Sequence, residues 1–349
     1  GGVEQIIKNL NVLANEKYKD LSIPYQKIDA AIRKCLTAKV TIPKTDYVIA
    51  LSRLGKESIA SAGGKIAFLG ELANALGFPV PSGFVVTTYA YQGFVQHNNI
   101  QDILHKRTKR LDIRNYDELT ATSHEMQQLI RSGDIPAYLE EAVFDAYRSM
   151  CQGAGEENLK VSVRSSALHE DIMASFAGQY KTALNVRAKD MLVQYKNVLS
   201  SQFTPRALFY YKDKGLDIEE IAMAVGVLAM VPAKVSGIMY SRDPGSPQEN
   251  AALISAVWGL GAYAVGGVVP TQDYRVSEEK IESPTACTQE AMLVGRPEGG
   301  TEPVPLNGEL LATQCLTEEQ ISSLASYARQ AETHFGQPQD MEWAIDQED

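Results

Sequence analysis

The sequence predicts a mixed α+β protein with two lobes. The chain has 349 residues, which is long enough for two core-forming units. Stretches with helical periodicity alternate with short apolar runs that glycine and proline interrupt, a texture typical of mixed α+β folds. Hydrophobic residues make up 44% of the chain and charged residues 22%, as in ordinary globular proteins. Neither wholesale disorder nor a membrane protein is indicated.

Charge and cysteine usage exclude several classes of partner. Lysine and arginine number 33 against 43 aspartates and glutamates, which gives a net charge of -10 and opposes binding to nucleic acid or an anionic membrane. No apolar run approaches the ~20 residues that span a bilayer. The four cysteines lack the spacing of a zinc site, so we expect reduced structural thiols and a cytoplasmic location. They are Cys35, Cys151, Cys287 and Cys315.

The order of patterns along the chain predicts three regions. Residues 1–45 carry two helical patterns, with Ile6 and Leu10 in the first and Ile28 in the second, and form a helical N-terminal extension. Residues 46–231 form a first lobe with a helical insertion. Residues 232–349 form a second lobe, which we expect to end before its last strand. The boundary near 232 follows from a proline after a long apolar run.

The first lobe combines strands with a long helical stretch. Apolar runs at 84–86, 161–163 and 221–231 predict strands, whereas the period over 96–152 predicts helices. Gly63-Gly64-Lys65 precedes an apolar stripe and is expected to open a helix. The segment 284–308, rich in proline, glycine, glutamate and threonine, is expected to be a surface excursion and a poor place to seek chemistry.

The last segment predicts a helix followed by a strand. Thr317 and Gln320 have the spacing of a capping box, and Gly336 with a following proline ends the helical stripe. In the next strand a period of two places Asp340 and Glu342 on one face. Paired carboxylates on a rigid strand suit Mg²⁺, whose shell substrate phosphates complete. A solvated strand face explains the same alternation, and the pattern alone favours it.

Other short motifs could hold phosphate. Lys65 would offer an ammonium group at a helix N-terminus, and Arg164 at a strand end would offer a fork of donors. A surface lysine and a structural salt bridge are the alternatives. The small residues of 175–179 could bring backbone N–H groups close to an anion, although such a glycine more often marks a turn. Neither a P-loop at Lys65 nor a dinucleotide fingerprint at 259–264 has the required spacing.

Taken together and in order, these motifs resemble the ATP-grasp domain of the phosphoenolpyruvate synthase and pyruvate phosphate dikinase family. The resemblance covers the chain from about Leu51 to the end. The most specific matching motifs are Ala62-Gly63-Gly64-Lys65, Pro79-Val80-Pro81-Ser82-Gly83-Phe84, Val163-Arg164-Ser165-Ser166, Ser175-Phe176-Ala177-Gly178-Gln179, Gly237-Ile238-Met239-Tyr240-Ser241-Arg242 and Gln339-Asp340-Met341-Glu342-Trp343-Ala344.

The resemblance implies a two-lobed ATP-grasp fold that binds ATP and Mg²⁺, with roles for matched positions. Lys65 and Arg164 would contact the phosphates and act in catalysis, and Arg242 would approach them from the second lobe. Glu342, with Asp340 beside it, would bind the metal. The remaining matched positions are Gly178 and Thr182 in a hairpin over the phosphates, and Leu228, Met230 and Val231 in the hinge that receives adenine.

The family also implies the reaction and its partners. Phosphate would pass from ATP to a histidine on a separate domain of the same enzyme, and pyruvate would meet only a third domain. A chain from Gly1 to Asp349 would then be a fragment of the enzyme. Leu228 replaces a usual glutamine and Ala262 a usual acidic residue. A vestigial or regulatory nucleotide-binding module, or the ATP domain of a rifampicin- or glucan-type phosphotransferase, therefore stays an alternative.

Overall fold

The computed structural model describes residues 2–37, 41–168, 180–216, 221–277, 280–282 and 289–347. These fall into two compact units, 1–41 and 42–349. The sequence motif at 175–179, with its Gly178, lies outside the described residues, as do His169 and Cys287.

The first unit is a helical hairpin. Helix α1 spans Gly2–Leu13 and α2 spans Ser22–Thr37, with the 3-10 turn η1 (Lys19–Leu21) before α2. Asn15 and Glu16 adopt positive φ values of 49° and 63°, which reverses the chain. The side chain of Asn11 accepts a hydrogen bond from the backbone N–H of Tyr18 at 3.0 Å, so it fixes the turn. Both helices predicted in this extension are present.

The first lobe of the second unit is built on a five-stranded sheet with the order β1-β2-β5-β3-β4. Every neighbouring pair in it is antiparallel, and the central strand β5 pairs with both β2 and β3. The strands are β1 (Val48–Ala50), β2 (Gly83–Val86), β3 (Val161–Ala167), β4 (Thr182–Val186) and β5 (Met223–Ala229).

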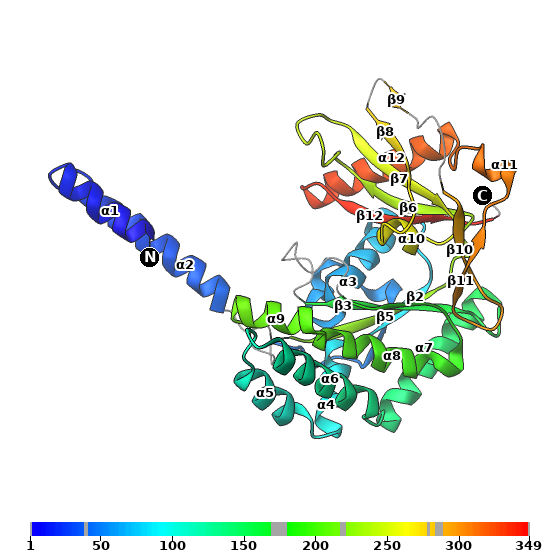
Figure 1. Cartoon of the computed structure of the whole chain (residues 1–349), viewed down its shortest axis with the longest axis horizontal. Coiled ribbons are helices and arrows are strands. Elements are labelled where there is room, and N and C mark those ends of the chain that lie inside the picture. The colour runs from blue at the N-terminus through cyan, green and yellow to red at the C-terminus, as the bar shows by residue number, and fades with distance from the viewer. Residues whose placement is uncertain are drawn as a thin grey trace. The chain divides into compact units, whose positions relative to one another are not determined.

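Helices cover both faces of this sheet. Figure 1 shows α3 on the side that faces the second lobe and the other helices on the opposite side. Phe84, Phe94 and Phe203 are among the fully buried side chains of the lobe. The helices are α3 (Ile59–Leu76), α4 (Thr88–His97), α5 (Gln101–Arg110), α6 (Tyr116–Ser132), α7 (Ala137–Ala154), α8 (Met191–Ser200) and α9 (Pro205–Lys214), with 3-10 turns η2 (Leu51–Arg53), η3 (Lys56–Ser58), η5 (Ala188–Asp190) and η6 (Ser201–Phe203).

The second lobe contains another five-stranded sheet, with the order β12-β6-β7-β8-β9. One face of this sheet packs on α12 (Glu318–Phe335) through a cluster that includes Ile254, Tyr274 and Ala325. In Figure 1 strand β12 lies nearest to the first lobe and β9 farthest from it. The strands are β6 (Val235–Tyr240), β7 (Ala252–Trp258), β8 (Gln272–Val276), β9 (Ile281–Glu282) and β12 (Asp340–Ile345), and α10 (Ala262–Val265) and α11 (Gly308–Leu311) are short helices.

A two-stranded hairpin of β10 (Ala291–Gly295) and β11 (Thr301–Pro305) connects the lobes. At its tip the carbonyl oxygens of Arg296 and Pro297 accept from Lys160 Nζ at 3.0 and 2.6 Å. Asn185 Nδ2 donates to the carbonyl oxygens of Arg296 and Gly300, both at 2.7 Å. The predicted surface location holds for 291–305, where no residue is buried, but the strands of this hairpin and the bonds of its tip to first-lobe side chains were not predicted.

The mixed α+β class is confirmed, and so are several local predictions. Thr317 and Gln320 form the capping box of α12, and Gly336 ends that helix with a φ of 70°. Strand β12 alternates between exposed and half-buried residues as its period predicted. Gly63-Gly64-Lys65 opens a helical segment as predicted, but another helical segment from Ile59 precedes it. The two parts of α3 meet at Gly63, whose φ of 69° and ψ of 164° are not helical.

Candidate functional site

An ion pair joins the two sheets at the centre of the candidate site. Arg164 of β3 donates from Nη2 to Glu342 Oε2 of β12 at 3.1 Å. The Arg164 side chain is 24% exposed and that of Glu342 50%. These residues are 178 positions apart in the chain, so only the packing of the lobes brings them together. An exposed pair of this kind contributes about 0–1 kcal/mol, so it can be exchanged for ligand contacts at small cost.

The strand around Arg164 leaves part of its guanidinium without a protein partner. Its Nε atom is buried and finds no hydrogen-bond acceptor in the described part of the chain. Arg164 lies between Thr182 on β4 and Gly226 on β5 in the register of the sheet. A Cβ added to Gly226 would lie 2.3 Å from Ile66 Cδ1 of α3 and 3.5 Å from Arg164 Cγ. Glycine is therefore needed where α3 and Arg164 crowd the same face.

Lys65 lies just after the interruption in α3. A Cβ on Gly63 would meet the carbonyl oxygen of Ser166 at 2.0 Å, so the chain at Gly63 touches the end of β3. The backbone N–H of Ile66 donates to Ser166 Oγ at 3.1 Å. Ser166 thus caps the second part of α3 from a strand 100 residues away in the sequence. The half-buried Lys65 precedes Ile66 and is therefore held near β3, the strand of Arg164.

The two predicted metal ligands share one face of β12. Asp340 and Glu342 are both exposed, and their cross-strand partners on β6 are Tyr240 and Ile238. Burial, together with the negative charge of Asp340, raises the pKa of Tyr240 above its ordinary value. Met341 and Trp343 lie on the opposite face and pack against the core of the second lobe. The strand therefore presents its carboxylates toward the first lobe while its apolar side anchors it.

The predicted hinge lies at the end of β5. Leu228 is 4% exposed and belongs to an apolar cluster with Ile66 of α3, so its side chain is part of the core. The backbone N–H of Met230 donates to the carbonyl oxygen of Lys160 at 2.9 Å. Met230 and Val231 are half-buried. Any contact of Leu228 with a purine would come from its backbone.

Arg242 forms a separate cluster. Its Nε donates to Glu332 Oε1 of α12 at 2.7 Å. Burial opposes ionisation of Glu332, yet hydrogen bonds from Ser241 and Arg242 prevail and hold its pKa below the ordinary value. Ser241 also accepts from the backbone of Gln339, next to Asp340. Arg242 thus pairs with α12, whereas Arg164 and Glu342 pair with each other across the lobes.

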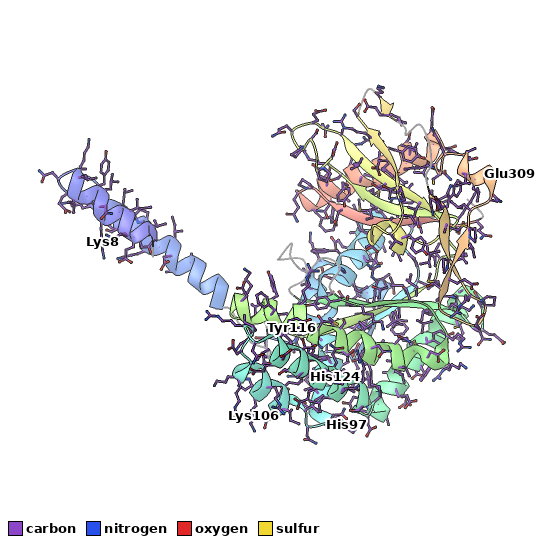
Figure 2. All side chains as sticks on the ribbon, in the orientation of Figure 1. Lys8, His97, Lys106, Tyr116, His124 and Glu309 are labelled. Atoms are coloured by element: carbon purple, nitrogen blue, oxygen red, sulfur yellow. The ribbon has the colours of Figure 1, made fainter. Side chains whose placement is uncertain are left out.

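One histidine that no sequence motif singled out makes a contact between the lobes. His334 Nε2 donates to Glu71 Oε1 of α3 at 2.7 Å. A contact between helices 263 positions apart has no signature in either local pattern. In contrast, His97 and His124 lie on α4 and α6 among the helices on the side of the first lobe away from the second (Figure 2).

The chemistry of the donors suits a magnesium nucleotide. Arginine and lysine side chains bind phosphate oxygens, and Mg²⁺ commonly takes one or two carboxylates together with substrate phosphates. Within the described ranges no group of three or more acidic, histidine or cysteine side chains could hold a metal alone. Asp340 and Glu342 match the one or two carboxylates that such a Mg²⁺ site uses. No helix in the same ranges is both long enough and apolar enough to cross a membrane.

Comparison with known proteins identifies the family of this chain. The family model described as pyruvate phosphate dikinase, AMP/ATP-binding domain, matches residues 59–349. A probable phosphoenolpyruvate synthase of Methanocaldococcus jannaschii is 36% identical over 304 residues, which cover 86% of this chain and 26% of that protein. The phosphoenolpyruvate synthase of Pyrococcus furiosus is 33% identical over 338 residues, with 85% and 41% covered.

A second kind of relative is equally similar. The rifampicin phosphotransferase of Bacillus subtilis is 36% identical over 303 residues, which cover 86% of this chain and 34% of that protein. The chain therefore spans less than half the length of each of these three relatives. Since the family model matches most of the chain, from residue 59 to its last residue, the chain belongs to the pyruvate phosphate dikinase AMP/ATP-binding domain family.

Proposed function

We propose that residues 42–349 bind ATP and Mg²⁺ between the facing surfaces of the two sheets, in an ATP-grasp arrangement. The observation that carries this proposal is the Arg164 to Glu342 contact, which places an arginine and a carboxylate from different lobes at 3.1 Å. The buried Nε of Arg164 adds a donor without an acceptor in the described residues, as an anion site requires. An ATP phosphate would supply the missing acceptor.

Each matched residue then has a physical task. Lys65 and Arg164 neutralise phosphate charge, and phosphoryl transfer depends chiefly on such positioning and neutralisation. Glu342 and Asp340 hold Mg²⁺, which supplies further neutralisation of the phosphates. Thr182 covers the phosphates from the β4 side, and Arg242 approaches from the second lobe. The backbone of Leu228, Met230 and Val231 receives the adenine.

The phosphoryl group would pass to a histidine on a separate domain of the same enzyme. The longer relatives support this division of labour, because they extend well beyond the matched part. Their names divide between phosphoenolpyruvate synthase and rifampicin phosphotransferase, so either pyruvate or rifampicin would be the final acceptor. The buried free thiols Cys151 and Cys315 support a reducing, cytoplasmic setting.

A regulatory nucleotide-binding module is the second candidate. Leu228 favours it, because this side chain is packed in the core at a position where the family has a glutamine. Ala262, which replaces an acidic residue, stands in the short helix α10 and could weaken the phosphate end of the site. A module of this kind would bind nucleotide without transferring phosphate.

Calorimetry with ATP and Mg²⁺ tests the proposal. We expect the intact chain to bind, and Lys65→Ala and Glu342→Ala each to lose about 2 kcal/mol, the scale of a charged phosphate or metal contact. Circular dichroism confirms that each variant is folded. Absence of binding by the unaltered chain, or equal affinity in all three proteins, would overturn the assigned site.

A further inference from the structure

A buried carboxylate links the two lobes beside the candidate site. The side chain of Glu71 on α3 is 10% exposed. It accepts from His334 Nε2 on α12 at 2.7 Å and from the backbone N–H of Lys56 at 3.1 Å. The pKa of Glu71 is below its ordinary value, first because of the bond from His334 and then because of the one from Lys56. A carboxylate so enclosed is stable only with such partners.

Aromatic contacts surround this pair on the same two elements. Phe68 of α3 meets Phe335 of α12 edge to face, with ring centroids 5.3 Å apart. Phe78, just after α3, lies 4.7 Å from the ring of Tyr327. His334 and Phe335 also touch, at 5.1 Å. These contacts and the Glu71–His334 bond form one interface, here called the clasp: Phe68, Glu71 and Phe78 on one side and Tyr327, His334 and Phe335 on the other.

The clasp lies on the two elements that carry the proposed ligand-binding residues. Lys65 precedes Glu71 on α3 by about 9 Å along the helix axis, at 1.5 Å per residue. On the other side, α12 ends at Phe335 and the chain enters β12 at Asp340, two residues before Glu342. A shift of α12 against α3 would therefore move Glu342 relative to Lys65 and Arg164.

We infer that Glu71 and His334 are positioning residues for nucleotide binding, which set the spacing between Lys65 on one lobe and Glu342 on the other. This inference rests on the proposed function. Neither residue touches the nucleotide; each acts through the helix that carries it. The bond is directional and buried, whereas the aromatic contacts around it tolerate sliding, so the hydrogen bond fixes the register of the two helices.

Other charged groups lie around the pair. Lys56 Nζ lies 3.8 Å from Glu71 Oε1. Glu57 and Glu71 both come close to Gly55. On α12, Arg329 lines an open depression of about 410 Å³ together with His334. The Glu71–His334 bond therefore lies among charged side chains of both lobes.

The first test compares His334→Gln and Glu71→Gln with Gln330→Ala, a control on the exposed side of α12. Nucleotide affinity is measured by calorimetry with the non-hydrolysable analogue AMP-PNP and Mg²⁺ at a temperature where every variant is folded. We expect each clasp variant to bind about tenfold more weakly, within the range of coupling between distant groups, and the control to bind like the unaltered protein. The double variant should lose no more than either single variant.

Hydrogen exchange separates positioning from general stability. In the clasp variants exchange should rise in α3 and α12 but not in β5 and β7. Equal affinities in the clasp variants and the unaltered protein overturn the clasp alone. If the unaltered protein binds no AMP-PNP, the proposed function fails and the positioning role fails with it.

Discussion

Arg164 and Glu342 meet at 3.1 Å although one belongs to the sheet of the first lobe and the other to the sheet of the second. Under the proposed function, Arg164 would exchange this contact for phosphate and Glu342 would exchange it for the metal. In the structure the two opposite charges stabilise each other by pairing.

Replacing Glu342 should separate metal-dependent from metal-independent binding. In Glu342→Gln we expect ADP binding with Mg²⁺ to weaken by about 1–2 kcal/mol, since a metal contact is lost. In EDTA the same variant should bind ADP as tightly as the unaltered protein or up to about 1 kcal/mol more tightly, because Arg164 is no longer paired. Calorimetry under both conditions measures the two values.

Glu309→Gln is the matched control for that variant. It makes the same change of charge on the exposed helix α11 of the second lobe, and Glu309 lies at the edge of that lobe in Figure 2. Its affinity should equal that of the unaltered protein under both conditions. A loss of affinity in EDTA for Glu342→Gln would contradict the role given to the ion pair.

The glycine that interrupts α3 should be far more sensitive than another glycine with the same backbone angle. Gly63→Ala needs a φ of 69° and brings Cβ to 2.0 Å from the carbonyl oxygen of Ser166. We expect a loss of roughly 3 kcal/mol in the free energy of unfolding, from backbone strain and overpacking together. Gly77→Ala has a φ of 68° but open space around its Cβ. It should cost about 1 kcal/mol, and urea titration of both variants checks the difference.

Removing the carboxylate of Glu71 should change how stability depends on pH. Its pKa is lowered in the folded protein, so the native state binds fewer protons than the unfolded state between the folded pKa and the unfolded value. The stabilisation is thus complete above the unfolded pKa and disappears as the pH falls through the folded pKa. Glu71→Gln should be less stable at pH 7 by about 1–3 kcal/mol.

The same variant should also lose less stability on acidification than the unaltered protein. Thermal unfolding followed by circular dichroism between pH 7 and pH 3 measures both slopes. Parallel curves would show that Glu71 titrates alike in the folded and unfolded states.

Asn185 is a first-lobe side chain that bonds to the tip of the β10–β11 hairpin, and Lys160 is another. Asn185 has a φ of 55° and donates to two carbonyl oxygens of the tip. Asn185→Gly keeps the backbone conformation and removes both bonds, so we expect faster hydrogen exchange over 296–300, measured by mass spectrometry. Exchange in β6 and β7 should not change and serves as the internal control. Unaltered exchange at the tip would show that Lys160 holds it alone.

The sequence predicted elements whose cause is local. The capping box at Thr317 and the alternation of β12 were visible, because the hydrogen bond and the side-chain period involve near neighbours. The clasp and the docked hairpin were not, since Glu71 meets His334, and Lys160 meets Arg296, only after the lobes pack. Gly63 lies between these cases. Its glycine pair indicated an unusual backbone, but only contact with Ser166 shows why the helix breaks there.

The same distinction applies to the candidate site. Lys65, Arg164 and Glu342 were chosen from motifs. The structure pairs Arg164 with Glu342 and places Lys65 just after the break in α3, while their ligand-binding roles stay predictions. The burial of Leu228 could not be foreseen, because a run of apolar residues does not tell which face of a strand meets a helix.

The order of strands in the first sheet also bears on how the protein is made. Strand β5 is synthesised last among the five strands of that sheet, yet it lies at the centre, between β2 and β3. Before residue 229 leaves the ribosome, the sheet can exist only as the separate pairs β1–β2 and β3–β4. The nascent first lobe must therefore expose apolar strand faces until the hinge sequence itself has emerged. The sheet of the first lobe is therefore completed at nearly the same time in translation as the second lobe begins to be made.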